Sequence, residues 1–211
     1  NERLRETLSV ALAGVEHERV DCSATLPRLA GNRVLFALSL SDHGLDLEVI
    51  SLIASLRQNP DVMEGATGAI IIDGAGELYT KQTADMLALA ANLAGCRFPG
   101  KPLVEATGSL DNWNIQSLRR GVSLAQAYRQ AARELVVRLM EFSWQTKERP
   151  SVLLLHASDR ATSNTLQIGT KIVERLLPSC DIREISLQNG AIFDCRGCSY
   201  KTCAHFARQN S

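Results

Sequence analysis

The sequence lacks long apolar runs and an excess of charge of either sign. No apolar run approaches the roughly 18 residues that a membrane-spanning helix needs. The 23 basic side chains balance the 23 acidic ones, so the chain offers little attraction to nucleic acid or to an anionic membrane surface. The first residues also lack a signal-peptide pattern. We therefore expect no nucleic acid and no membrane among the partners of this protein.

The cysteines do not follow the pattern of a secreted, disulfide-bonded protein. There are six in 211 residues, and three of them fall within residues 195–203. Small secreted domains instead use their cysteines as a framework of paired bridges. We therefore expect a reducing, cytoplasmic environment.

What the sequence does contain is a regular alternation of apolar strands and amphipathic helices. Strands are expected at 18–22, 34–40, 68–73 and 102–106, and helices at 2–14, 45–56, 80–94 and 123–142. This spacing suits right-handed crossovers between parallel strands. We infer a three-layer α/β domain with a mostly parallel sheet over residues 1–146, ending in a polar linker.

A second strand–loop–helix segment begins after Pro150. Val152–Leu155 is a continuous apolar run, which indicates a strand buried on both faces. The next residues are polar, and Thr162 or Ser163 is suited to cap a helix that stops at Pro178. The first turn of a helix has N–H groups without partners and carries the positive end of the helix dipole, so it attracts anions.

Side chains around this helix start could complete a site for a phosphate dianion. The candidate ligands are the hydroxyl, amide and guanidinium groups of Ser158, Arg160, Thr162, Ser163, Asn164 and Thr165. The alternative is an ordinary capped helix after a buried strand, and these residue types alone favour neither. The loop has no Gly-x-x-x-x-Gly-Lys pattern, which argues against a nucleoside triphosphate.

The run Ala157-Ser-Asp-Arg-Ala-Thr-Ser-Asn-Thr resembles the phosphate loop of flavodoxin-like, NAD(P)H-dependent FMN reductases, Gly-Ser-x-Arg-x-x-Ser-Asn-Thr. The resemblance extends over residues 150–204, and Ala157 replaces the usual glycine. It implies an oxidoreductase whose loop holds the phosphate of FMN. It also implies that the flavin takes hydride from NADH or NADPH and passes electrons to a small acceptor. We further expect a homo-oligomer.

Residues 150–211 match only the first half of a flavodoxin-like FMN-binding domain. They supply a strand, a helix and a second strand at 181–187, whereas flavodoxin-like domains have about five parallel strands. Three explanations are open. The natural chain continues beyond Ser211, which we favour; or a partner chain completes the unit; or the two strands join the first sheet in a permuted domain. The permuted domain predicts that Val152–Leu155 pairs with a strand of the first domain.

Residues 1–146 resemble, more loosely, a degenerate flavodoxin-like domain that precedes the reductase module in some bacterial oxidoreductases. Ligands of such sheets bind at the carboxyl ends of the strands. Around the glycines of Gly74-Ala-Gly76 the chain places Asp73, Glu77, Tyr79 and Lys81. We interpret these as solvated side chains at a helix start rather than as a ligand site. The third glycine of a dinucleotide fingerprint is missing.

The cysteine cluster comprises Cys195, Cys198 and Cys203, with the spacing C-x2-C-x4-C. Thiolates this close in sequence can converge on zinc or an iron–sulfur cluster, with His205 as a candidate fourth ligand. A reduced loop without metal and a redox dithiol at Cys195 and Cys198 are the alternatives.

Two alternatives to a flavin oxidoreductase are open at this point. One is a non-enzymatic α/β module that binds a ligand and senses metal or redox state. The other is a phosphate-binding α/β domain whose ligand is not flavin. No acidic or basic side chain stands out as a catalyst, so in the flavoenzyme the transfer chemistry would belong to the cofactor.

Overall fold

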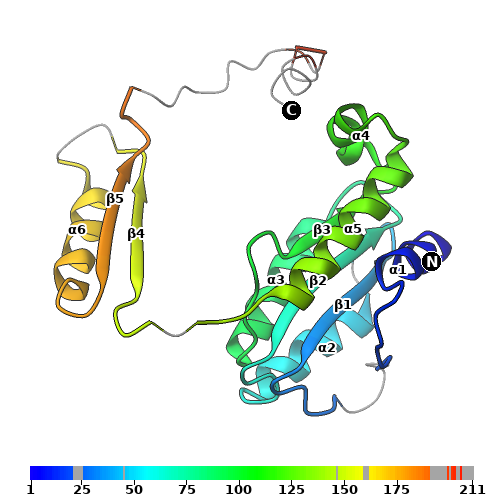
Figure 1. The fold of residues 1–211 in the computed structure, drawn as a ribbon, viewed down its shortest axis with the longest axis horizontal. Helices are drawn as coiled ribbons and strands as arrows, with labels where there is room; N and C mark the ends of the chain where they lie inside the picture. The colour runs from blue at the N-terminus through cyan, green and yellow to red at the C-terminus, as the bar shows by residue number, and fades with distance from the viewer. Residues whose placement is uncertain are drawn as a thin grey trace. The chain divides into compact units, whose positions relative to one another are not determined.

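The computed structural model describes residues 1–20, 26–44, 46–145, 147–158, 162–190, 199, 201, 202 and 205. Within them the chain forms two compact units, an N-terminal unit over Asn1–Phe142 and a C-terminal unit over Ser143–Ser199. Both are α/β units built on parallel strands (Figure 1). None of the described helices is long and apolar enough to cross a membrane.

The N-terminal unit is a three-stranded parallel sheet with helices on both faces. Its strands lie in the order β1 (Arg33–Leu40), β2 (Thr67–Gly74) and β3 (Leu103–Ala106). The crossover helices are α2 (Leu47–Gln58) and α3 (Thr80–Leu93). The remaining helices are α1 (Glu2–Ala11), η1 (Asp111–Trp113), α4 (Asn114–Arg120) and α5 (Leu124–Glu141). This is the strand and helix alternation that the sequence predicts.

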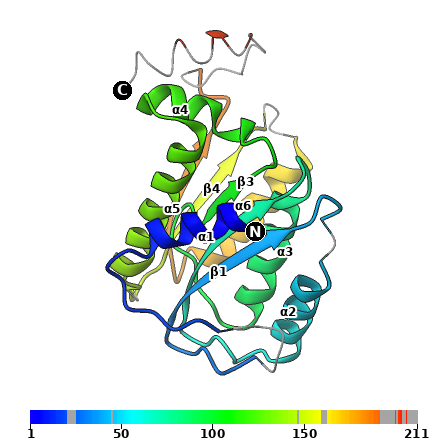
Figure 2. The same ribbon diagram turned by 90° about the vertical axis from the view of Figure 1, so that its right-hand side faces the viewer.

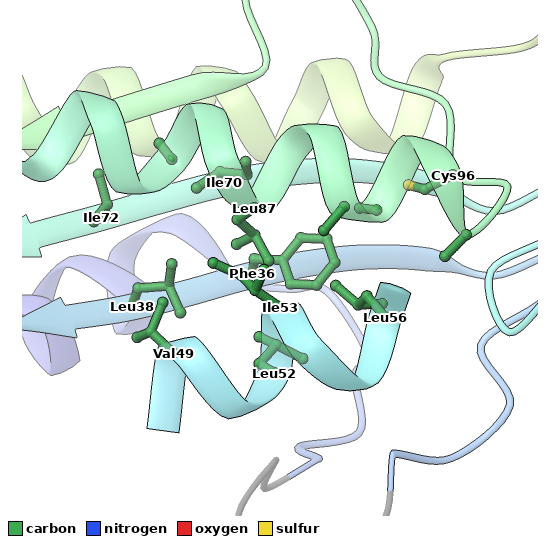
Figure 3. Packing of buried hydrophobic residues seen from close by; sticks show 14 of the residues in the cluster. Phe36, Leu38, Val49, Leu52, Ile53, Leu56, Ile70, Ile72, Leu87 and Cys96 are labelled. Carbon is green, nitrogen blue, oxygen red and sulfur yellow. The ribbon is translucent and has the colours of Figure 1, made fainter. Parts of the chain in front are cut away.

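Strand β2 is the centre of this unit because it is buried on both faces. Ile70 and Ile72 point into a core shared with α2 and α3 (Figure 3). Ala69 and Ile71 point into a second core shared with α1 and α5. All four side chains are at most 1% exposed. An unbroken apolar run is what a parallel strand between two helix layers requires.

The helices cover the sheet in two pairs. Helices α2 and α3 lie on one face and α1 and α5 on the other (Figure 2). Helix α5 begins at a capping box, in which Ser123 and Gln126 bond each other's backbone N–H groups. Its buried residues recur at helical spacing and include Ala127, Ala131 and Leu135. The helix predicted at 123–142 is therefore confirmed.

The C-terminal unit consists of β4 (Ser151–His156), α6 (Asn164–Leu176) and β5 (Asp181–Ser186). Its two strands are parallel, with His156 opposite Ser186. Helix α6 packs closely on β4, since a methyl group added at Gly169 would lie 3.1 Å from Leu154 Cδ1. Among the described residues of this unit, Cys180 is the only buried apolar one. Such a thin unit buries little surface compared with an independently folding domain.

Strand β4 is not buried on both faces, contrary to the expectation from its apolar run. Leu153 and Leu155 are 56% and 55% exposed. A run of leucines does not show how many strands and helices surround a strand. Strand β4 has one neighbouring strand and packs against α6 on one side, so part of its apolar surface stays exposed. The permuted domain is also wrong for the described strands, because β4 pairs with β5 and the strands form two separate sheets.

Two local expectations differ from the structure. Glu18–Val20 has no regular structure, and Asp21 and Cys22 of the strand expected there lie outside the described residues. The short helices η1 and α4 were not anticipated. They begin after Leu110, which has a positive φ of 64°, and short helices carry too few periodic positions to be recognised from sequence.

Replacing Leu87 by alanine tests the core between the sheet and α3. Leu87 is 0% exposed, whereas Leu89 on the same helix is 54% exposed. Leu87→Ala should lower the free energy of unfolding by about 2–5 kcal/mol, and Leu89→Ala should change it by about 0.5 kcal/mol or less. Urea unfolding of both variants measures the difference. Equal losses would contradict the assigned packing.

The thiol of Cys96 should make the N-terminal unit sensitive to alkali. Cys96 is 3% exposed, and burial raises its pKa to about 12. The unfolded thiol ionises near pH 8.5, so the free energy of unfolding should fall as the pH rises from about 9 to 12. Burial also raises the pKa of Tyr128, which adds a similar fall. In Cys96→Ala the fall should be shallower than in the wild type; an unchanged slope would contradict the assignment.

Candidate functional site

The segment between β4 and α6 has the strand–loop–helix geometry that the sequence predicts for an anion site. Ser163 is the N-cap of α6, and its Oγ accepts a hydrogen bond from the Leu166 N–H at 3.4 Å. The Ser158 Oγ lies 3.1 Å from the Ser163 Oγ. The structure therefore brings together two hydroxyls from the two ends of the loop, beside a helix start.

The first turn of α6 presents further polar groups to solvent. By helix geometry the N–H groups of Asn164 and Thr165 have no acceptor within the helix. The side chains of Thr162, Asn164 and Thr165 are exposed, and those of Ser158 and Ser163 are half-buried. Arg160 lies outside the described residues, so its expected role stays a prediction. Five of the six predicted ligands are thus placed around one helix terminus.

A histidine that the sequence analysis did not select lies at the end of β4. The His156 Nε2 is 3.0 Å from Glu184 Oε1 on β5, and the side chain is 11% exposed. Its Nδ1 is buried without a hydrogen-bond partner among the described residues. The contact links the carboxyl ends of the two strands next to the loop. Only the pairing of β4 with β5 brings these two residues together, so their positions in the sequence do not predict the contact.

The predicted metal ligands Cys195, Cys198 and Cys203 lie outside the described residues, and His205 is described and exposed. Within the described part of the chain, no group of three or more histidine, cysteine or acidic residues could hold a metal. Metal binding at the cysteine cluster therefore stays a prediction.

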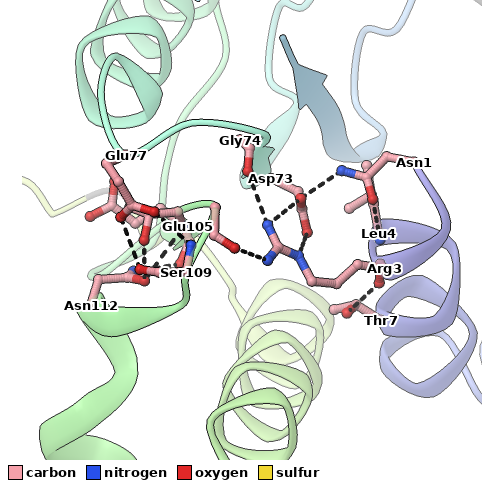
Figure 4. A network of polar contacts seen from close by, with 12 residues as sticks. Asn1, Arg3, Leu4, Thr7, Asp73, Gly74, Glu77, Glu105, Ser109 and Asn112 are labelled. Carbon is pink, nitrogen blue, oxygen red and sulfur yellow. Dashed lines mark hydrogen bonds and ion pairs between the residues drawn. The ribbon is translucent and has the colours of Figure 1, made fainter. Parts of the chain in front are cut away.

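The carboxyl edge of the N-terminal sheet carries the most extensive polar network (Figure 4). Asp73, near the end of β2, is 0% exposed. The guanidinium of Arg3 on α1 donates to both of its oxygens, from Nε at 2.9 Å and from Nη2 at 2.8 Å. The Asn1 Nδ2 donates to the same carboxylate at 2.6 Å. Arg3 and the buried carboxylate of Asp73 therefore form a bidentate ion pair.

Arg3 also bonds backbone carbonyls at this edge. Its Nη1 donates to the Gly108 oxygen at 2.9 Å, and its Nη2 to the Gly74 oxygen at 3.0 Å. The hydrogen bond to Asp73 is the main cause that raises the pKa of Arg3, with the charge of Asp73 adding to it. The guanidinium thus ties α1 to the ends of β2 and the loop after β3.

The residues next to this ion pair are also engaged with one another. Glu77 accepts hydrogen bonds from the Ser109 N–H at 2.6 Å and the Ser109 hydroxyl at 3.0 Å. The backbone bond is the main cause that lowers the pKa of Glu77. The Thr80 hydroxyl donates to Glu105 at 3.2 Å. The edge is a connected network of side chains held by one another.

Four residues around Gly74-Ala-Gly76 were expected to be solvated side chains. The structure agrees with this expectation except at Asp73. Tyr79 and Lys81 are exposed. Asp73 is instead fully buried and paired with Arg3. The sequence analysis missed Arg3 because 70 positions separate it from Asp73, and no local pattern links them.

Comparisons with models of protein families, with curated protein sequences and with solved structures give no match for this chain.

Replacing Ser163 by alanine tests its role as the cap of α6. Ser163→Ala should destabilise the helix by about 1 kcal/mol, because the Leu166 N–H loses its acceptor. Ser158→Ala removes only the hydroxyl pair and serves as the control. Hydrogen exchange of the α6 amides measures the effect. If both variants exchange as slowly as the wild type, Ser163 does not cap the helix.

Proposed function

We propose that this protein is an NAD(P)H-dependent FMN oxidoreductase, with the FMN phosphate held by the strand–loop–helix at 156–166. The observation that carries the proposal is the pair of hydroxyls of Ser158 and Ser163, 3.1 Å apart at the start of a 13-residue helix. Hydroxyls and free N–H groups at a helix N-terminus form the donor set that a phosphate monoester requires.

The described residues fit the phosphate end of the cofactor. Ser158, Thr162, Ser163 and Thr165 offer hydroxyl donors, and Asn164 offers its amide. Arg160, from the same loop, would supply the one positive side chain. The helix dipole adds a favourable field for a dianion. Ser163 accepts a bond from the Leu166 N–H, and one proton of the Ser158–Ser163 pair lies between the two hydroxyls. The other hydroxyl proton of the pair can be donated to an oxygen anion.

Bound FMN would supply the hydride chemistry, taking two electrons from NADH or NADPH for a small acceptor. The chain's part is to fix the phosphate and so to anchor the cofactor. The His156 contact with Glu184 holds together the strand ends that carry the loop. We place the protein in the cytoplasm and expect a homo-oligomer.

A second candidate is a non-enzymatic α/β module that binds a different phosphate-bearing ligand. It is favoured by one observation: all the candidate donors described here suit a phosphate, and none is specific for a flavin ring. Competition between FMN, riboflavin and inorganic phosphate separates the two functions. If inorganic phosphate displaces FMN completely, and the protein binds phosphate as tightly as it binds FMN, the second candidate would be favoured.

The substitution Ser163→Asp separates the cap from the phosphate site. Aspartate caps a helix as well as serine does, but it places a negative charge beside the expected phosphate. We expect the unfolding of the variant to be unchanged within about 0.5 kcal/mol, with FMN affinity reduced at least about tenfold, equivalent to about 1.4 kcal/mol.

Fluorescence titration of the full chain with FMN measures this affinity. Ser151→Asp, at the opposite end of β4, is the matched charge control and should bind FMN as the wild type does. No FMN binding by the wild type, or equal affinities of the wild type and Ser163→Asp, would refute the proposed phosphate site.

A further inference from the structure

The carboxyl edge of the N-terminal sheet presents three hydrogen-bond acceptors to one point. They are the Asp73 carboxylate and the main-chain oxygens of Gly74 and Gly108. These acceptors belong to the end of β2 and to the loop after β3, both of which are fixed by the sheet. The Gly108 N–H is itself bonded to the Gly76 oxygen at 2.8 Å, which ties that loop to the turn after β2. The acceptors are thus held in place before any cation meets them.

A cation is needed to balance the negative charge of these acceptors. Asp73 is 0% exposed, and an unpaired carboxylate at such a position would be strongly unfavourable. Its two oxygens and the two carbonyls are met by four hydrogen bonds from a single guanidinium (Figure 4). An ammonium group has three donors and no planar fork, so it cannot make this pattern.

The hydroxyl of Tyr128 on α5 is a further polar group beside this ion pair. Tyr128 is 1% exposed, and its hydroxyl has no hydrogen-bond partner among the described residues. It lies near enough to Asp73 and Arg3 for both charges to act on it, and burial with the Asp73 charge raises its pKa. The hydroxyl of Tyr128 thus adds a buried polar group to the surroundings of the ion pair.

We infer that this edge of the N-terminal sheet is a binding site for a guanidinium group, and that Arg3 is the ligand the chain supplies to it. We name the Asp73 carboxylate and the carbonyls of Gly74 and Gly108 the guanidinium site. Open α/β sheets bind their ligands at this carboxyl edge. In this unit the guanidinium of Arg3, which belongs to the chain itself, lies there. The N-terminal unit therefore differs in charge preference from the phosphate site proposed for the C-terminal unit.

The rest of α1 is fastened separately, so the site can be emptied without releasing the helix. Arg129 is paired with Glu6, and Arg133 donates to the Ala11 and Ala13 oxygens at 2.8 Å. Leu4 and Ala11 are buried against the sheet and α5. Truncating the Arg3 side chain should leave α1 docked and a guanidinium-shaped gap beside Asp73.

Chemical rescue of Arg3→Ala tests the inference. The variant should unfold at a temperature several degrees lower than the wild type. N-ethylguanidinium at millimolar concentration should restore at least half of that loss and should saturate. Ethylammonium at the same concentration should not. Arg5→Ala, which removes an exposed arginine from the same helix, should show neither the loss nor the rescue.

Three results would overturn the inference: no saturable rescue, equal rescue by ethylammonium, or the same response in Arg5→Ala. If Arg3→Ala does not fold, Arg3→Lys decides. Lysine keeps the charge but lacks the planar fork, so this variant should unfold several degrees below the wild type. Unfolding of Arg3→Lys at the wild-type temperature would show that the site needs only a positive charge.

Discussion

The N-terminal unit depends on one buried charge, the carboxylate of Asp73. The carboxylate lies near the end of β2, which has a helix layer on each face, so water cannot solvate its charge. The protein neutralises it with Arg3 from α1. Because a buried carboxylate without its partner costs several kcal/mol by itself, the stability of this unit depends on the contact between Asp73 and Arg3. The same contact closes the edge of the sheet at which ligands of such folds bind.

The two units use the carboxyl edge of a parallel sheet in opposite ways. In the N-terminal unit, a carboxylate and carbonyls bind a cation that belongs to the chain. In the C-terminal unit, the hydroxyls of Ser158 and Ser163 lie at the positive end of α6, where Asn164 and Thr165 are exposed. Only the second arrangement is suited to a phosphate group, so our functional proposal rests on the C-terminal unit.

Elements with long apolar periodicity could be predicted from the sequence. The run Ala69–Ile72 gave β2, and the spacing in 123–142 gave α5, because burial dictates both patterns. The Ser163 cap followed from local chemistry. Arg3 with Asp73 and His156 with Glu184 could not be predicted, since only tertiary pairing brings them together. The exposure of Leu153 and Leu155 was also unpredictable, because it depends on how many strands flank β4 and not on β4 itself.

The most direct measurement is a two-dimensional NMR titration of the full chain with FMN, followed through the backbone amides. The account predicts that the amides of residues 163–166, at the start of α6, shift strongly and saturate. It also predicts that those of residues 2–4, at the start of α1, stay in place. Shifts at α1 with none at α6 would contradict the assignment of the phosphate site to the C-terminal unit.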